Sequence, residues 1–235
     1  MPKIVVVTPT YNEADNLPIL AGRLFSLPLD NLSLIVVDDN SPDGTAAIAR
    51  SLASIHKWPI TVIDRPYKAG VGTAYIKGFR LAGDADYVVQ MDADLSHNPG
   101  YIVGFINFFK SNDIDVIVAS RYLSGGSDMR HGFKRRLLSR VGVAYCKVVL
   151  GLPLTDVTGG FKCFRRSALD CLDLSKIRSN GFAFQVEMAY ACYRKRLRVK
   201  EMPICFVDRK YGYSKISSGM IVETIWRPWQ IRFRY

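Results

Sequence analysis

Short apolar runs alternate with longer amphipathic segments through the first half of the chain. The runs are rich in β-branched residues and end in polar or turn residues, which predicts strands. Between them, residues 14–26, 43–56, 70–83 and 98–111 have the pattern of helices, and SPDGT and HNPG supply turn and cap residues for the second and fourth. The predicted strands are KIVVVTPTYN, LSLIVVDDN, ITVIDRP, YVVQMDADL and DVIVASRY.

Strands that alternate with helices predict an α/β fold, with a mostly parallel central sheet covered by helices on both faces. Ligands of such sheets bind at the carboxyl ends of the strands. One acid at a strand end is often only a helix cap, as we expect of Asp43 before GTAAIA. Five acids reaching the same edge indicate a site. The strand-end residues are Pro9, Tyr11, Glu13, Asp38, Asp39, Arg65, Lys68, Asp92, Asp94 and Arg121.

The acids of DADL, Asp92 and Asp94, are the strongest chemical signal. Because side chains alternate along an extended segment, both point to the same side if the strand persists. Carboxylate oxygens suit Mg²⁺ or Mn²⁺, which share their coordination with substrate phosphates. A glycosidase-like acid–base pair fits less well, because no separated second acid accompanies them. The pair therefore predicts a divalent metal beside a diphosphate.

The glycine-rich stretch KAGVGTAY, residues 68–75, opens the third predicted helix. It is not the GxxxxGK[ST] loop, and it lacks the third glycine of the dinucleotide fingerprint, which argues against both of those nucleotide sites. Two interpretations stay open. Its backbone N–H groups can face a phosphate, or the glycines can serve only a tight strand-to-helix turn.

Composition indicates one core: the 235 residues are 49% hydrophobic, and no linker divides them. The first strand begins without a signal-peptide pattern, so we expect a cytoplasmic chain. The five cysteines are odd in number, widely spaced and free of CxxC, which favours reduced thiols over disulfides or zinc.

Charge is divided unevenly along the chain. Residues 1–120 contain 9 Lys/Arg and 13 Asp/Glu, whereas residues 121–235 contain 23 and 8. The basic half can be a solvated surface, or it can face an anionic partner, for which nucleic acid, anionic lipid and a phosphorylated substrate stay open.

Eight ordered segments spread over residues 3–216 resemble the family 2 glycosyltransferases, and within them the dolichol-phosphate and polyprenol-phosphate mannosyltransferases. This resemblance implies a GT-A fold, Rossmann-like in its nucleotide-binding part, and a Mg²⁺ or Mn²⁺ cofactor. It also implies inverting transfer of mannose from GDP-mannose to a polyprenyl (dolichyl) phosphate. The segments are TPTYNE, VVDDNSPDGT, KAGVGTAY, MDADLSHNP, SRY, DVTGGFK, GFAFQVEM and FVDRKYGYSK.

The resemblance also assigns residues. Asp92 and Asp94 match metal and donor-diphosphate ligands, and with Arg121 they form the implied catalytic set. Some relatives have Gln at the position of Ser96, where it can reach the metal. Ser96 offers a shorter oxygen ligand to the metal, which leaves room for a water and leaves the metal preference open. The residues implied to hold GDP-mannose are Pro9, Tyr11, Glu13, Val37, Asp39, Lys68, Ala93, Arg209 and Lys215, and those implied to contact the acceptor phosphate are Arg135 and Ser139.

A phosphate acceptor changes what the site needs. It is already an anion near pH 7, so it can attack without a catalytic base. Glu187 in FQVEM is therefore either a base, as hydroxyl acceptors require, or an acid that orients cationic side chains. We expect His97 to be structural. Residues 125–133 form either a lid or a plain surface loop.

No apolar stretch reaches the ~18 residues of a spanning helix. We expect a catalytic domain over residues 1–216 and an amphipathic segment over 217–235 that mixes aromatic residues with arginines, with Pro228 interrupting any single helix. This segment can anchor at a membrane interface or pack on the domain, and the helix around KRRLLSRVGVAYCKVV can also reach the interface. The expected location is peripheral, on the cytoplasmic side of a membrane, with a possible membrane-anchoring partner subunit.

Two rival functions stay open. A transferase of the same fold can use UDP-glucose to make polyprenyl-phosphate glucose, since fold does not fix the donor. A non-catalytic binder of anionic lipid or nucleic acid can use the basic half, although the acidic strand ends argue against a polyanion binder and against nucleic acid as a partner.

Overall fold

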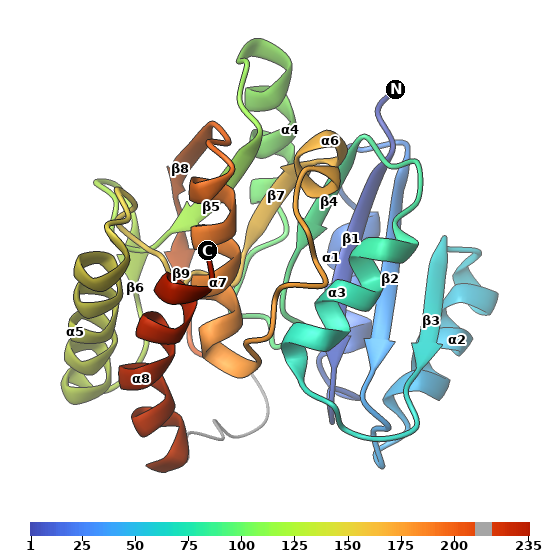
Figure 1. The fold of residues 1–235 in the computed structure, drawn as a ribbon. Helices are drawn as coiled ribbons and strands as arrows, with labels where there is room; N and C mark the ends of the chain where they lie inside the picture. Colours follow the sequence, from blue (N-terminus) through green and yellow to red (C-terminus); the bar gives the residue numbers. More distant parts are fainter. Residues whose placement is uncertain (210–217) are drawn as a thin grey trace.

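A seven-stranded sheet forms the middle layer of the protein in the computed structural model (Figure 1). The structure describes residues 1–209 and 218–235, with the backbone alone at 134–135 and 218–224. The strands are β1 Ile4–Thr10, β2 Leu32–Asp38, β3 Ile60–Asp64, β4 Tyr87–Gln90, β5 Val116–Ser120, β6 Ser127–Asp128, β7 Lys162–Arg165, β8 Val199–Pro203 and β9 Cys205–Phe206. The helices are α1 Leu17–Phe25, α2 Thr45–His56, α3 Val71–Leu81, α4 Tyr101–Ser111, α5 Phe133–Leu150, α6 Arg166–Asp170, α7 Gly181–Arg194 and α8 Ser218–Arg234.

The sheet has the strand order β3-β2-β1-β4-β7-β5-β8. All neighbouring strands are parallel except at β7, which runs antiparallel to β4 and β5. The predicted mostly parallel α/β fold is confirmed. The four predicted helices are also confirmed, and each begins one to three residues later than the pattern indicated.

Helices cover both faces of the sheet, which is why its central strands are continuous apolar runs. On one face, Leu20 of α1 and Phe105 of α4 belong to the same buried cluster. On the other face, Phe79 of α3 and Phe184 of α7 do so. A third cluster joins α5, α7 and α8, so the last helix packs on the domain.

The expectation that Pro228 interrupts a helix is wrong, because α8 runs through it. Proline removes one backbone donor, and its ring strains the preceding turn. Contacts with α5 on both sides of Pro228 offset this cost: the Tyr145 hydroxyl donates to the Ile225 carbonyl over 2.7 Å, and Arg232 donates to the carbonyl of Val149.

The loop over residues 125–133 is tied to a distant segment. Within it, β6 pairs in parallel with β9, and the His131 N–H donates to Asp208 Oδ2 over 2.6 Å. Among the described residues, no helix is both long and apolar enough to cross a bilayer.

Helix α3 lies close against β1 at Gly78, where an added Cβ would overlap Cγ1 of the buried Val7. We expect Gly78→Ala to lower the free energy of unfolding by about 1–3 kcal/mol, because valine is stiff and the core is close-packed. Urea unfolding measures this change.

Gly104→Ala is the matched control, since Gly104 is also inside a helix but has no atom within 4 Å of the added Cβ. Helix propensity alone should make that variant more stable by about 0.5–1 kcal/mol. Stabilisation of both variants would contradict the close contact of α3 with β1.

Candidate functional site

Acids from two strand ends and one cation meet at the carboxyl edge of the sheet. Arg209 Nη2 lies 3.3 Å from Asp94 Oδ2. Burial raises the pKa of Glu13 to about 7, the hydrogen bond from Asn16 opposes that shift, and the charges of Asp94 and Asp92 add to it. The structure therefore brings Glu13, Asp92, Asp94 and Arg209 to one space; the strand-end pattern predicted this for the acids, and the family resemblance implied it for Arg209.

Asp92 and Asp94 stand half-buried at a tight turn after β4. Ala93 and Leu95, on the alternate positions, are buried in the core, and Leu95 has a left-handed φ of 63°. Asp94 Oδ1 accepts the Ser96 N–H over 3.1 Å. The alternation thus leaves both carboxylates at the edge, with the methyl group of Ala93 turned into the core.

Tyr75 supports Asp92 from α3, since its hydroxyl donates to Asp92 Oδ1 over 2.6 Å. Burial and the charge of Asp94 raise the pKa of Asp92 to about 6, although the Tyr75 hydrogen bond and the cations of Lys162 and Arg209 lower it. The sequence analysis did not predict this role of Tyr75, because Tyr75 lies 17 residues before Asp92, on a helix whose pattern indicates only an amphipathic helix packed on the core.

The carboxylates of Asp92 and Asp94 fit a divalent cation whose remaining coordination positions are filled by a substrate. Within the described part of the chain, no three His, Cys, Asp or Glu side chains are grouped to hold a metal. Magnesium and manganese accept such a partial site, because they keep waters and take further oxygens from phosphates. Ser96 is buried beside Asp94, and its hydroxyl stays a predicted ligand.

Asp39 at the end of β2 holds the neighbouring loops together. Its Oδ1 lies 2.7 Å from Arg65 Nη1, and its Oδ2 accepts the Gly70 N–H over 2.9 Å. Arg65 also donates to the Gly70 carbonyl over 3.1 Å and to Thr73 Oγ1 over 2.6 Å. Because both side chains are buried, this pair fixes the turn before α3.

Asn180 clamps the same glycine-rich turn from the start of α7. Its Oδ1 accepts the Gly72 N–H over 2.9 Å, its Nδ2 donates to the Ala69 carbonyl over 2.8 Å, and a Cβ on Gly70 would overlap it. Side chains thus occupy the N–H groups of Gly70 and Gly72, which favours the tight-turn interpretation of KAGVGTAY. Sequence could identify Asn180 as a helix cap, but not its contact with a loop more than 100 residues away.

Other predicted nucleotide residues lie along the same edge. Lys68 Nζ stands 3.8 Å from the centroid of the Tyr11 ring, a cation–π contact. Pro9 is half-buried near the end of β1, and Val37 is fully buried in β2. Asp43 forms the expected cap-like contacts, accepting the Thr45 and Ala14 N–H groups over 3.1 and 3.0 Å.

A cavity of about 310 Å³ opens beside Asp92 and contains Arg121 and Arg130 in its wall. Arg121 donates to both oxygens of Asp156, over 2.7 and 2.9 Å, and to Thr158 over 2.7 Å. Burial alone would raise the pKa of Asp156, but the hydrogen bond from Arg121 holds it below its usual value. The segment DVTGGFK begins with Asp156, but the sequence does not show that this carboxylate holds the Arg121 guanidinium in a bidentate geometry.

His97 lines this cavity, and the buried Lys162 lies behind it, hydrogen-bonded to the lining residue Gln185. Burial lowers the pKa of His97 to about 4, so the imidazole is neutral at pH 7, and its ring lies against Phe161 and Phe206 as a structural residue would. Burial also lowers the pKa of Lys162 to about 8. Its Nζ donates to Gln185 Oε1 over 2.7 Å, which places this ammonium near the paired acids.

Glu187 is fully buried and already has partners. One oxygen accepts the N–H groups of Arg178 and Ser179 over 3.2 and 2.7 Å, and the other lies 2.5 Å from Arg234 of α8. These contacts support the interpretation of Glu187 as an orienting acid rather than as a base.

The predicted acceptor contacts are only partly described. On α5, Ser139 Oγ lies 3.0 Å from the hydroxyl of Tyr122, which follows β5. The side chain of Arg135 and the whole of Lys215 lie outside the described residues.

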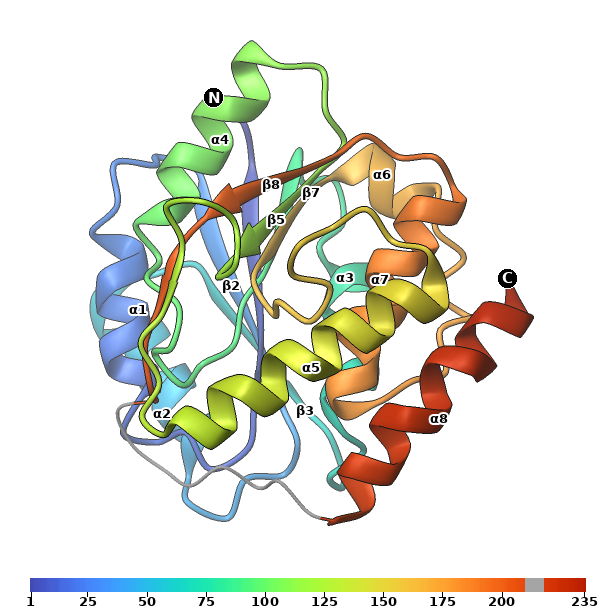
Figure 2. The same ribbon diagram turned by 90° about the vertical axis from the view of Figure 1, so that its left-hand side faces the viewer.

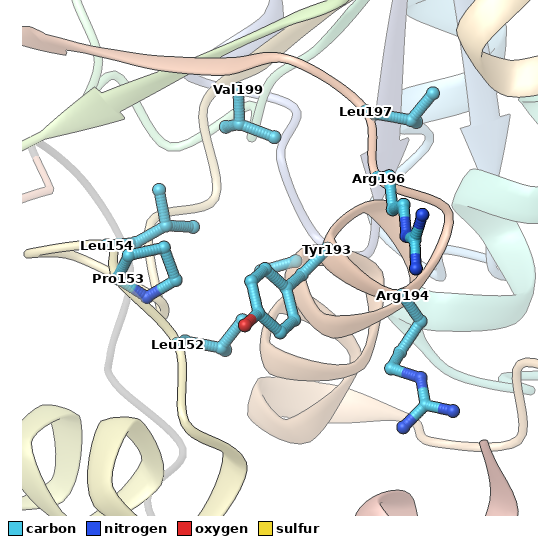
Figure 3. Close-up of a pocket in the computed structure, with 9 residues that line it drawn as sticks. Leu152, Pro153, Leu154, Tyr193, Arg194, Arg196, Leu197 and Val199 are labelled. Carbon is cyan, nitrogen blue, oxygen red and sulfur yellow. The ribbon is translucent and has the colours of Figure 1, made fainter.

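A larger cavity, of about 620 Å³, lies at the other end of α7 (Figure 3). Tyr193 faces Leu152, Pro153 and Leu154 across it, and Arg194 and Arg196 lie at its side. No predicted site residue lines it, so volume alone does not identify the active site.

Comparisons with known proteins agree with this geometry. Residues 5–173 match the model of glycosyl transferase family 2. The chain is 36% identical to a polyprenol monophosphomannose synthase of Mycolicibacterium smegmatis, over 99% of this chain and 88% of that protein. It is 38% identical to an undecaprenyl-phosphate mannosyltransferase of Micrococcus luteus, over 95% and 91%.

Solved structures show the same fold. A mannosyltransferase of Pyrobaculum calidifontis in complex with GDP-Man and Mn²⁺ superposes with a TM-score of 0.65 at 22% identity, covering 90% of this chain and 59% of that one. A glucosyl-3-phosphoglycerate synthase of Mycobacterium tuberculosis bound to UDP superposes with a TM-score of 0.70 at 19% identity, covering 99% and 80%.

The raised pKa of Glu13 predicts a pH-dependent stability. Because the pKa rises from 4.5 to about 7 on folding, the native state prefers the protonated carboxyl, and this stabilisation is lost as the pH rises through about 7. Glu13→Gln stays neutral, so it should gain unfolding free energy relative to the parent chain between pH 4.5 and pH 7.5. Urea unfolding without added divalent cation tests this, and an identical difference at both pH values would refute it.

Proposed function

This chain belongs to glycosyl transferase family 2, and from that premise we propose that it transfers mannose from GDP-mannose to a polyprenyl phosphate with inversion at the anomeric carbon. One observation carries the proposal: Asp92 belongs both to the acidic edge with Asp94 and to the cavity that contains Arg121. A donor diphosphate at the edge and an acceptor phosphate in the cavity would then lie on either side of one sugar. The names of the two curated relatives support this donor group and this acceptor.

On the donor side, Asp92 and Asp94 would hold Mg²⁺ or Mn²⁺, and the metal would neutralise charge that develops on the leaving diphosphate. Tyr75 fixes the position of Asp92, and Arg209 adds a cation at Asp94. These two contacts restrict where the carboxylates of Asp92 and Asp94 can lie, which supports a preorganised edge for the transition state.

On the acceptor side, Arg121 is held rigidly by Asp156, and Arg130 by Asp128. Fixed guanidinium groups can orient a phosphate oxygen for attack on the anomeric carbon. We assign Arg135, Ser139 and Lys215 to the same phosphate from the family resemblance. A phosphate oxygen needs no general base, which agrees with the occupied carboxylate of Glu187.

Replacing either paired acid should abolish transfer. We expect Asp92→Asn and Asp94→Asn each to lower mannosyl transfer at least ~1000-fold, about 4 kcal/mol in the activation barrier, because the diphosphate loses its metal. The assay supplies purified protein, Mg²⁺ or Mn²⁺, a short polyprenyl phosphate and labelled GDP-mannose, and counts label in the lipid phase. Asp84→Asn, an exposed acid that pairs with Lys3, should keep full activity.

Parallel reactions with UDP-glucose separate the rival functions. Label from UDP-glucose alone would overturn the choice of donor while keeping the transfer chemistry. Absence of label from both donors, with vesicle binding retained, would favour a non-catalytic lipid binder.

We further propose that residues 217–235 form an interfacial segment beside a catalytic domain of residues 1–216. Helices α5 and α8 lie side by side at one surface of the molecule (Figure 2). Trp229 Nε1 donates to the Tyr145 hydroxyl over 2.9 Å, which joins the two helices. Their exposed side chains form what we call the α5–α8 apolar face: Phe133, Leu137, Leu138, Val141, Val148, Ile225, Trp226, Trp229 and Phe233.

An exposed apolar face with tryptophans is typical of proteins that bind at a membrane interface. We therefore place the enzyme peripherally on the cytoplasmic side of a membrane, where its lipid acceptor resides. A membrane-anchoring partner subunit would bind at the same side.

Flotation with liposomes tests this face. We expect Trp226→Ala/Phe233→Ala to weaken vesicle binding about tenfold or more, because two large apolar side chains no longer leave water. Ile55→Ala/Leu81→Ala removes two exposed apolar side chains far from this face and should have no effect. Equal losses in both variants would contradict the assignment.

A further inference from the structure

A third cavity, of about 480 Å³, lies between α5 and the segment that follows β5. Arg140 and Lys147 contribute its α5 wall, and Arg121 and Tyr122 contribute the opposite wall. No carboxylate lines it among the residues the structure describes. Among the described lining residues, it shares only Arg121 with the cavity beside Asp92, so the two are separate spaces that have this side chain in common.

The nearby acids are already engaged elsewhere. Asp156 is paired with Arg121, and Asp128 is paired with Arg130. Glu201 accepts the N–H groups of Thr155 and Asp156 over 2.7 and 2.9 Å. In the described part of the chain, neither Arg140 nor Lys147 has a carboxylate within ion-pair distance, so the cavity has a positive charge that no described side chain neutralises.

These two cations lie along the edge of the α5–α8 apolar face. At 3.6 residues per turn, positions 140 and 147 fall on one flank of α5, and positions 137, 141 and 148 fall on the adjacent outward stripe. Tyr145 lies on the other flank, against α8. Figure 2 shows α5 in front, with α8 on one side and the 121–130 segment on the other. The cavity therefore opens beside the apolar stripe, away from α8.

From this arrangement we propose that the cavity binds the phosphate group of an anionic bilayer phospholipid, separate from the acceptor. The inference rests on the proposed membrane association. When an apolar stripe enters the acyl boundary, cations on its edge lie at the level of the lipid phosphates. Arg140 also stacks over the Tyr122 ring at 5.7 Å, which holds its guanidinium at the mouth of the cavity.

Lipid explains the surroundings of the cavity better than nucleic acid does. The walls between the cations are the aliphatic side chains of Val143 and Ala144, and the adjacent exposed residues Leu137 and Val148 are aliphatic too. Single-stranded nucleic acid is bound through successive aromatic side chains along a basic groove, whereas Tyr122 is the only aromatic residue among the described residues that line this cavity, and Arg140 already stacks over its ring. A lipid headgroup matches both the charge and the apolar border.

The test measures binding of the full chain to vesicles of phosphatidylcholine, and of phosphatidylcholine with phosphatidylglycerol at a 7:3 ratio, both without polyprenyl phosphate or donor. Each cation near an anionic surface contributes about fivefold in affinity, so Arg140→Gln/Lys147→Gln should lose about tenfold to thirtyfold for the phosphatidylglycerol vesicles. Binding to phosphatidylcholine vesicles should stay unchanged. Arg140→Lys/Lys147→Arg, which keeps both charges, should retain most of the affinity.

Arg194→Gln/Arg196→Gln is the matched control, because it removes the same charge from exposed arginines at the cavity of Figure 3. It should change binding less than twofold. An equal loss in the two double variants would show a net-charge effect and overturn the proposal. Inorganic phosphate that abolishes the preference for phosphatidylglycerol at constant ionic strength would also overturn it, by assigning the cavity to free anions.

Mannosyl transfer to a short, detergent-dispersed polyprenyl phosphate separates this proposal from the proposed function. Arg140→Gln/Lys147→Gln should transfer at the parental rate there, because neither residue contacts the catalytic cavity. Vesicle discrimination without transfer by the parent chain would reject the enzyme function and keep the lipid site. Transfer without vesicle discrimination would reject the lipid site and keep the enzyme.

Discussion

Burial of like-charged carboxylates at the sheet edge is the constraint on which the rest of the site depends. Glu13, Asp92 and Asp94 meet in a partly buried space, where burial raises the pKa values of Glu13 and Asp92 and the charge of Asp94 adds to both shifts. The protein offsets this cost with groups from distant parts of the chain. Tyr75 donates to one carboxylate, and Arg209 lies against another. Such a site is completed by a cation, which explains its suitability for a metal and a diphosphate.

In the cavity beside Asp92 the charges are reversed: a buried cation is held in place by an acid. Arg121 is held at two nitrogens by Asp156, and Thr158 accepts a third hydrogen bond. A guanidinium fixed in this way loses little conformational entropy when it binds a phosphate. The acidic edge and the cationic cavity meet at Asp92, which suits the proposed transfer, in which attack and departure take place on opposite sides of one sugar.

Helix α7 links this site to the surface proposed to meet the membrane. At the beginning of α7, Asn180 clamps the turn before α3 through two hydrogen bonds. Further along α7, Glu187 forms an ion pair with Arg234 of α8. The side of α8 that packs on the domain therefore connects with the residues that shape the donor site. Its exposed side, with Trp226 and Phe233, remains available for lipid.

The sequence by itself determined the order of strands and helices as far as β5, the edge where polar residues collect, and the paired acids, because periodicity and strand-end position are local properties. Motif resemblance added the family. Only the tertiary structure decided that β7 runs antiparallel, that α8 passes through Pro228, and that Tyr75, Asp156 and Asn180 position the site. Those features depend on contacts between residues 17 to more than 100 positions apart, which no local pattern encodes. The same holds for the cavity beside α5, whose charge is evident only once each neighbouring acid has been assigned its partner.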